Sequence, residues 1–86
     1  MNGTSEIVDR LTAEIAARAR MLPEQVGPDA HFIVDMGMSS LDVLCVLAFA
    51  EKDFAVSIPD EVLGDLTSLN KLADAVCHYQ EQASRQ

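Results

Sequence analysis

Apolar residues recur at helical spacing near the start of the chain. Residues 5–22 place apolar side chains three or four positions apart with charged side chains between them, which predicts an amphipathic helix. The apolar face of this helix consists of Ile7, Val8, Leu11, Ile15, Ala19 and Leu22. Thr4 or Ser5 can cap its start, and Pro23 ends it because the residue before a proline disfavours helical backbone.

The next residues, 23–38, have no sustained hydrophobic period and contain prolines and glycines. This pattern predicts a long loop, and loops of this length are uncommon in compact domains unless they have a function. The side chains expected to hold the loop against the core are Val26, Phe32, Ile33 and Met36. A second helix is predicted from Ser39 to about Phe54. Its interior, from Val43 to Ala50, is entirely apolar, so this helix is central to the core or presents an apolar face to another molecule.

The last third of the chain predicts one short helix and one longer helix. Residues 55–59 form an extended link, and residues 60–66 form a short helix that begins with two acidic residues. Thr67 or Ser68 then caps a final helix. The expected inward face of that helix is Leu69, Leu72, Ala73, Val76 and Tyr79. The polar tail, residues 81–86, is expected to fray.

Together these elements predict an all-α fold, a small four-helix antiparallel bundle. Three helices are longer and one is short, and a long loop lies between helices one and two. A chain of 86 residues forms one small domain, expected over residues 4–80, and its 49% of apolar residues can form a core without disulfides or metal. Cys45 and Cys77 are expected to be reduced and buried as small hydrophobic residues.

Composition and charge narrow the choice of partners. No apolar run is long enough to span a membrane, and the N-terminus lacks the basic and apolar regions of a signal peptide, so a cytoplasmic location is expected. The net charge of −8 is concentrated between Glu24 and Asp65, where Lys52 is the single base among nine acids. Nucleic acid is not expected as a partner, because phosphate binding requires the opposite charge. An acidic middle can attract basic proteins or simply confer solubility.

The sharpest local feature is a pair of serines where the long loop meets the second helix. Ser39 and Asp42 have the spacing of a capping box, in which the Ser39 hydroxyl accepts a hydrogen bond from a backbone N–H of the first turn. Ser40 is then the first helical residue, and its hydroxyl lies free at the positive end of the helix. A phosphate on that oxygen would be favoured by the unpaired N–H groups and the helix dipole. These residues alone also allow both serines to act only as caps.

The wider context resembles the acyl carrier protein family. Residues 32–42, FIVDMGMSSLD, are similar to the modification site of that family, usually written D-L-G-x-D-S-L-D. Residues 51–61, EKDFAVSIPDE, are similar to its segment E-E-x-F-x-x-x-I-P-D-E, and the spacing between the two blocks fits without a gap. Residues 67–69, Thr-Ser-Leu, match as well, and the resemblance extends from about residue 5 to residue 80.

The resemblance implies that Ser40 receives 4'-phosphopantetheine from coenzyme A. The thiol of that arm holds acyl groups as thioesters and presents them to successive enzymes, so the chain is a carrier and not an enzyme. A serine hydroxyl is a poor nucleophile without a neighbouring base, and no histidine lies near Ser40 in sequence. The Mg-dependent phosphopantetheinyl transferase would supply that activation. The other implied partners are acyl-transferring, condensing or modifying enzymes with basic docking patches, and the carrier itself is expected to be a monomer.

Two sets of site residues follow from the same resemblance. The residues expected to contact partners are Asp35, Met38, Leu41, Asp42, Glu51 and Asp53. The residues expected to enclose an acyl chain between the helices are Val46, Ala50, Ile58, Leu63 and Leu66. For each member of the second set, a place in an ordinary core remains the alternative interpretation.

Three positions depart from the family pattern. Ser39 stands where an acid usually precedes the modified serine and contacts the metal of the transferase. Cys45 and Lys52 occupy positions of the second helix that are often acidic in the family. These departures favour a specialised carrier, for a polyketide, modified-lipid or other dedicated pathway, over one for general fatty-acid synthesis.

The same sequence features are compatible in part with two other kinds of protein. An aminoacyl or peptidyl carrier would use the same arm with a different load, and the acidic balance and residues 58–61 favour the acyl version. A rival of another class is an unmodified helical interaction domain whose apolar second helix binds a partner. An enzyme is disfavoured because no convergent acid, base and nucleophile appear. His31 and Asp35 are too few to form a metal site.

Overall fold

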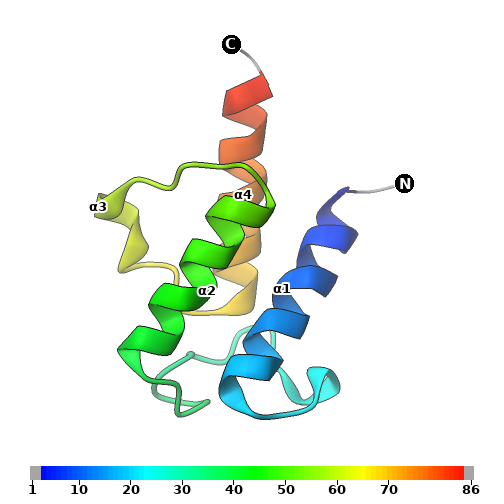
Figure 1. The fold of residues 1–86 in the computed structure, drawn as a ribbon, viewed down its shortest axis with the longest axis vertical. Helices are drawn as coiled ribbons and strands as arrows, with labels where there is room; N and C mark the ends of the chain where they lie inside the picture. Colours follow the sequence, from blue (N-terminus) through cyan, green and yellow to red (C-terminus); the bar gives the residue numbers. More distant parts are fainter. Residues whose placement is uncertain (1–2, 85–86) are drawn as a thin grey trace.

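The chain folds into a small bundle of α-helices. A computed structural model describes residues 3–84 and contains α1 (Gly3–Ala19), the 3-10 turn η1 (Pro23–Gln25), α2 (Ser40–Asp53), α3 (Asp60–Leu63) and α4 (Leu69–Ser84). No strand occurs within that range, so the predicted all-α fold is confirmed. Figure 1 shows that α1 runs opposite to α2 and α4, and that short α3 lies to one side of α2. α1 contacts both α2 and α4.

The first helix buries most of its predicted apolar face but ends early. Ile7, Leu11 and Ile15 are buried, whereas Leu22 is 57% exposed and lies outside the helix. α1 ends at Ala19 because Arg20 adopts a left-handed φ of 59°, which turns the chain before Pro23 is reached. At the other end the helix already includes residues 4 and 5, so the prediction that one of them caps its start is wrong.

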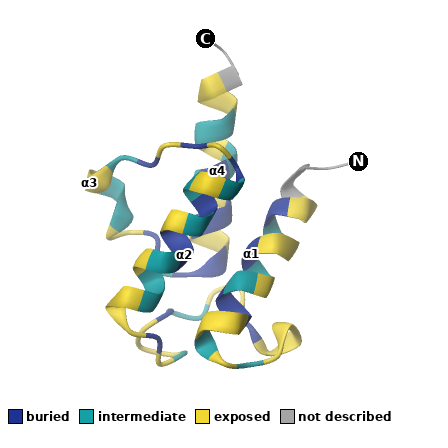
Figure 2. Cartoon of the chain, in the orientation of Figure 1, coloured by how far each residue is buried: buried dark blue, intermediate teal, exposed yellow. Residues whose placement is uncertain are grey.

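The long loop is held against the start of α4. Phe32 is 1% exposed, and its backbone N–H donates a hydrogen bond to the carbonyl of Thr67 at 2.8 Å. The carbonyl of Phe32 accepts a hydrogen bond from the N–H of Met38 at 3.0 Å, which closes the loop just before α2. Val26 is also buried and Met36 half-buried, but Ile33 is exposed, contrary to its predicted place in the core. Figure 2 shows this loop as alternating buried and exposed residues beneath the helices.

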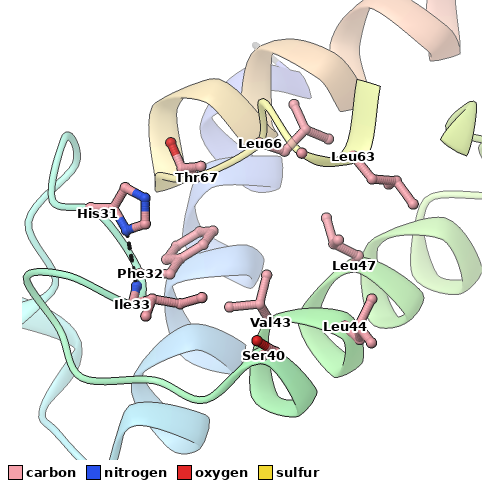
Figure 3. Close-up of a pocket in the computed structure, with 11 residues that line it drawn as sticks. His31, Phe32, Ile33, Ser40, Val43, Leu44, Leu47, Leu63, Leu66 and Thr67 are labelled. Atoms are coloured by element: carbon pink, nitrogen blue, oxygen red, sulfur yellow. Dashed lines mark hydrogen bonds between the residues drawn. The ribbon is translucent and has the colours of Figure 1, made fainter. Parts of the chain in front are cut away.

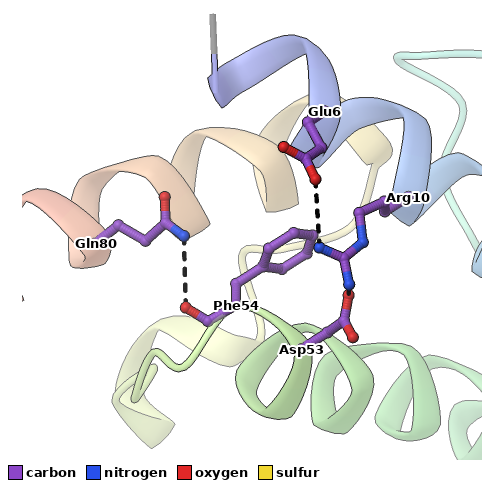
Figure 4. Close-up of polar contacts among 5 residues, drawn as sticks. All are labelled: Glu6, Arg10, Asp53, Phe54 and Gln80. Carbon is purple, nitrogen blue, oxygen red and sulfur yellow. Dashed lines mark hydrogen bonds and ion pairs between the residues drawn. The ribbon is translucent and has the colours of Figure 1, made fainter.

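A cluster of polar contacts links the end of α2 to α1 and α4. The guanidinium of Arg10 pairs with the carboxylates of Asp53 and Glu6, and it lies 5.1 Å from the centre of the Phe54 ring. The side-chain amide of Gln80 donates to the carbonyl of Phe54 at 3.4 Å (Figure 4). These contacts connect helices that are distant in sequence, and they fix where α2 ends and the link to α3 begins.

The third helix is shorter and the fourth longer than predicted. α3 ends at Leu63 rather than residue 66, because Gly64 has low helix propensity and the next N–H groups close tight turns. The hydroxyl of Ser68 accepts a hydrogen bond from the N–H of Lys71 at 3.4 Å, as expected for the residue before α4. α4 continues to Ser84 and so includes residues 81–84 of the predicted polar tail, since no glycine or proline interrupts them. Residues 85–86 lie outside the described range.

The predicted inward face of α4 is buried, apart from Tyr79, which is half-buried. Cys45 and Cys77 are free thiols, as predicted, but they are half-buried rather than fully buried. Over residues 3–84, no helix combines the length and the apolar character needed to cross a membrane.

Candidate functional site

The junction between the loop and α2 presents the two serines in different roles. Gly37 adopts a φ of 73°, a left-handed conformation that favours glycine, and Met38 then packs into the core. Ser39 is extended, and its hydroxyl accepts a hydrogen bond from the Asp42 N–H at 3.1 Å. The Asp42 carboxylate accepts one from the Ser39 N–H at 3.2 Å. The predicted capping box is therefore confirmed, and it commits Ser39 to starting the helix.

Ser40 is the first residue of α2, as predicted, and it is exposed. Its hydroxyl makes no hydrogen bond with any residue between 3 and 84, so it is available to an external reagent. The unpaired backbone N–H groups of the first helical turn lie beside it and favour a negative charge there. Figure 3 shows Ser40 at the edge of a cleft that opens between α2, the loop and the segment joining α3 to α4.

The cleft has a volume of about 320 Å³ and an almost wholly apolar lining. Its residues come from three parts of the chain and are His31, Phe32, Ile33, Ser40, Val43, Leu44, Leu47, Leu63, Gly64, Leu66 and Thr67. Among the residues expected to enclose an acyl chain, Leu63 and Leu66 line this cleft. Val46, Ala50 and Ile58 are instead buried in the core of the bundle. Val43, Leu44 and Leu47 were not predicted, although they share the face of α2 with Ser40 at helical spacing.

His31, which lines the cleft, forms several hydrogen bonds within the loop. The Nδ1 atom of His31 accepts hydrogen bonds from the backbone N–H groups of Ile33 and Val34, both at 3.1 Å. The carboxylate of Asp35 accepts a hydrogen bond from the His31 N–H at 2.8 Å. His31 and Asp35 therefore build a turn in the loop. Among residues 3–84, no group of three or more His, Cys, Asp or Glu residues is arranged to hold a metal ion.

The residues expected to contact partners differ in exposure and in their contacts within the chain. Leu41 is 70% exposed and next to Ser40, whereas Met38 is 3% exposed and packs within the bundle. The acids are engaged within the chain: Asp35 and Asp42 in the turn and the capping box, Glu51 with the N–H of Ile58 at 2.8 Å, and Asp53 with Arg10. The structure therefore brings Leu41 beside Ser40 but gives the carboxylates of α2 internal partners.

A second, polar cavity lies on the opposite side of the start of α2. It is lined by Ala17, Arg18, Ala19, Arg20, Gly37, Met38 and Asp42. The hydrogen bond of Arg18 to the Glu14 carboxylate, 3.2 Å long, raises the pKa of Arg18, with a smaller contribution from nearby Cys45. This arginine is therefore a permanent positive charge near the first turn of α2.

Known proteins are similar to this chain in sequence over most of its length. The family described as "Phosphopantetheine attachment site" matches residues 9–76, which include both serines and the entire cleft. The acyl carrier protein of Thermosynechococcus vestitus is 33% identical over 72 residues, 84% of this chain and 89% of that protein. The acyl carrier protein of Rickettsia bellii is 30% identical over 84 residues, 98% and 94% of the two chains. Acyl carrier protein 2, mitochondrial, of Arabidopsis thaliana is 29% identical over 75 residues, covering 87% of this chain and 60% of that protein.

Proposed function

Because this chain belongs to the acyl carrier protein family, whose members are carriers with a covalent 4'-phosphopantetheine group rather than enzymes, we propose that Ser40 carries this group. The observation that supports Ser40 most is that the hydroxyls of Ser39 and Ser40 have different hydrogen-bond environments. Ser39 is committed to the capping box, whereas the Ser40 hydroxyl is exposed and without a hydrogen bond in the described chain. An exposed hydroxyl at the N-terminal end of a helix fits a phosphodiester, since the free N–H groups and the dipole favour its negative charge.

The residues around Ser40 define what this chain contributes to the attachment. In the attachment reaction, the Oγ of Ser40 forms a bond to the phosphorus of coenzyme A that bears the pantetheine arm. The bond from that phosphorus to the adenosine bisphosphate breaks, and a base on the transferase takes the hydroxyl proton. Within residues 3–84, no basic group forms a hydrogen bond with the Ser40 hydroxyl. The chain therefore contributes an exposed hydroxyl in the electric field of the helix end, and the transferase contributes the base that activates it. When bound, the arm supplies a thiol that holds acyl groups as thioesters.

The cleft beside Ser40 supports an acyl load over an aminoacyl load. Its volume of about 320 Å³ is near the small end of ligand pockets, and aliphatic side chains from α2 and the α3–α4 segment form most of its walls. A charged amine would lose its hydration there without gaining an ion pair, whereas a hydrocarbon chain would lose little. We therefore assign Val43, Leu44, Leu47, Leu63 and Leu66 to the acyl-chain site.

The pathway and location complete the proposal. The uncharged Ser39 and the internal pairing of the α2 acids favour a specialised carrier, serving polyketide, modified-lipid or related fatty-acid enzymes. We propose the cytoplasm as the place where this carrier works. The alternative that is not a carrier is an unmodified interaction domain, because the exposed apolar residues of α2 could equally well bind a partner protein.

Intact-protein mass spectrometry tests this function. The purified chain is incubated with coenzyme A, Mg²⁺ and a broad-specificity phosphopantetheinyl transferase, and a gain of one phosphopantetheine group is expected. In parallel, separate samples of the unmodified chain receive coenzyme A thioesters of short fatty acids or of amino acids with the same transferase. Protection of the cleft residues from hydrogen exchange is expected with the acyl load only. An unchanged mass would favour the interaction domain, and protection by the aminoacyl load would favour the peptidyl carrier.

Replacing Ser39 tests whether the missing acid limits attachment. Aspartate and asparagine are both good helix caps, so Ser39→Asp and Ser39→Asn are expected to keep the stability of α2. Only Ser39→Asp adds the carboxylate that, in the family, contacts the metal of the transferase. We expect kcat/KM for attachment to rise about tenfold in Ser39→Asp, the effect of one favourable charge contact, and to stay unchanged in Ser39→Asn. Equal rates in the two variants would show that no metal contact is made at this position.

A further inference from the structure

None of the exposed residues of α2 carries a carboxylate. All of α2 lies in the described part of the chain, and its exposed residues are Ser40, Leu41, Leu44, Ala48 and Lys52. Leu41 and Leu44 are 70% and 55% exposed, and they follow Ser40 closely on this face. The only formal charge on the exposed face is therefore the positive Lys52. Figure 2 shows this face of α2 with its exposed residues along the helix.

The three acidic side chains of α2 all bind groups within the chain. Asp42 is bound in the capping box, Glu51 accepts the hydrogen bond of Ile58, and Asp53 pairs with Arg10. All three side chains belong to half-buried residues. A basic group of a partner would have to compete with these contacts, so the acids of α2 contribute little attraction at the surface.

Three uncommitted acids lie on and beside α3. Asp60, Glu61 and Asp65 are exposed, and their carboxylates make no hydrogen bond or ion pair with the residues that the structure describes. α3 lies across the cleft from α2, since Leu63 and Gly64 line the same cleft as Ser40 and Leu44 (Figure 3). The exposed apolar residues of α2 and the exposed acids on and beside α3 therefore lie on two elements that share one cleft.

From this division we propose that the transferase that modifies Ser40 docks on α2 through apolar contacts and directs its basic residues to α3. The inference rests on the proposed function, because an enzyme that forms a bond at the Ser40 Oγ must cover the residues next to it, Leu41 and Leu44. The occupant is a protein surface with an apolar centre and a basic rim on one side. That pattern matches the usual anatomy of interfaces, in which apolar groups form the core and charges at the rim steer association.

Steady-state kinetics of attachment test the apolar and the acidic residues separately. Leu41→Gln and Leu44→Gln keep side-chain size and helix propensity but remove the apolar contact. Each is expected to lower kcat/KM about tenfold, as for a central interface residue. The matched control is Leu22→Gln, an exposed leucine that does not line the cleft, which is expected to change the rate less than about twofold.

The acids are compared in the same assay at low and high salt. The combined variant Asp60→Asn, Glu61→Gln and Asp65→Asn is expected to lower kcat/KM several-fold at low salt and to flatten its salt dependence. Glu51→Gln keeps an oxygen for the Ile58 N–H and is expected to leave both values unchanged. A larger effect of Glu51→Gln than of the combined variant, or unchanged rates in both α2 leucine variants, would overturn the docking proposal. A wild-type chain that is never modified would instead overturn the proposed function on which it rests.

Discussion

Ser40→Ala is expected to abolish the attachment of phosphopantetheine completely. The variant removes the one oxygen that forms the new bond to phosphorus, and no neighbouring hydroxyl can replace it in the same position. Alanine has high helix propensity and the Ser40 side chain makes no hydrogen bond in the described chain, so the fold and its stability should be retained. Intact mass after incubation with coenzyme A and transferase measures the loss directly, and circular dichroism confirms that the variant is folded.

Ser39→Ala is the matched control for this experiment. It removes the hydroxyl that accepts the Asp42 N–H and should lower the free energy of unfolding by about 1 kcal/mol, the usual value of a helix cap. It should still gain one phosphopantetheine group, because Ser40 is untouched. Attachment that survives in Ser40→Ala, or that is lost in Ser39→Ala while the protein remains folded, would assign the arm to another residue.

The start of α2 could be predicted from sequence because its signals are local. A loop glycine, a serine cap and an acid three residues later determine where a helix begins, and the structure has all three features within residues 37–42. The same locality explains the errors at the ends of α1 and α3. Arg20 adopts a left-handed conformation, which the presence of an arginine does not predict. The end of α3 depends on turns whose hydrogen bonds form after Leu63.

The surroundings of the site could not be predicted in the same way, because they depend on contacts between distant segments. Asp53 is paired because Arg10, on another helix, lies close to it. The sequence alone does not distinguish an acid that is paired within the chain from one that is exposed to another protein. The cleft likewise combines residues 31–33, α2 and residues 63–67. Helical spacing from Ser40 identifies the α2 residues that share its face, but only the packed structure shows that the loop and α3 lie opposite that face.

Phe32→Ala is expected to cause the largest loss of stability among the variants considered. The ring is 1% exposed and forms part of the floor of the cleft, between α2 and the start of α4 (Figure 3). Removing a buried phenyl ring and leaving a cavity costs about 3–5 kcal/mol, a large share of the roughly 5–15 kcal/mol that holds a small domain folded. The loss should appear in urea unfolding followed by circular dichroism, as a lower midpoint.

The matched control is Phe49→Ala, which deletes the same ring from a half-buried position on α2. Phe49 packs edge-to-face against Phe54 with ring centres 6.4 Å apart, so its removal should cost a smaller amount, about 1–2 kcal/mol. Phe32 also holds the loop through its backbone bonds to Thr67 and Met38, and these bonds lose their shield from water when the ring is removed. Ser40 should therefore become more mobile in Phe32→Ala than in Phe49→Ala, with faster hydrogen exchange over residues 31–40. Equal losses of stability in the two variants, with unchanged exchange in the loop, would show that the Phe32 ring does not hold the attachment site in place.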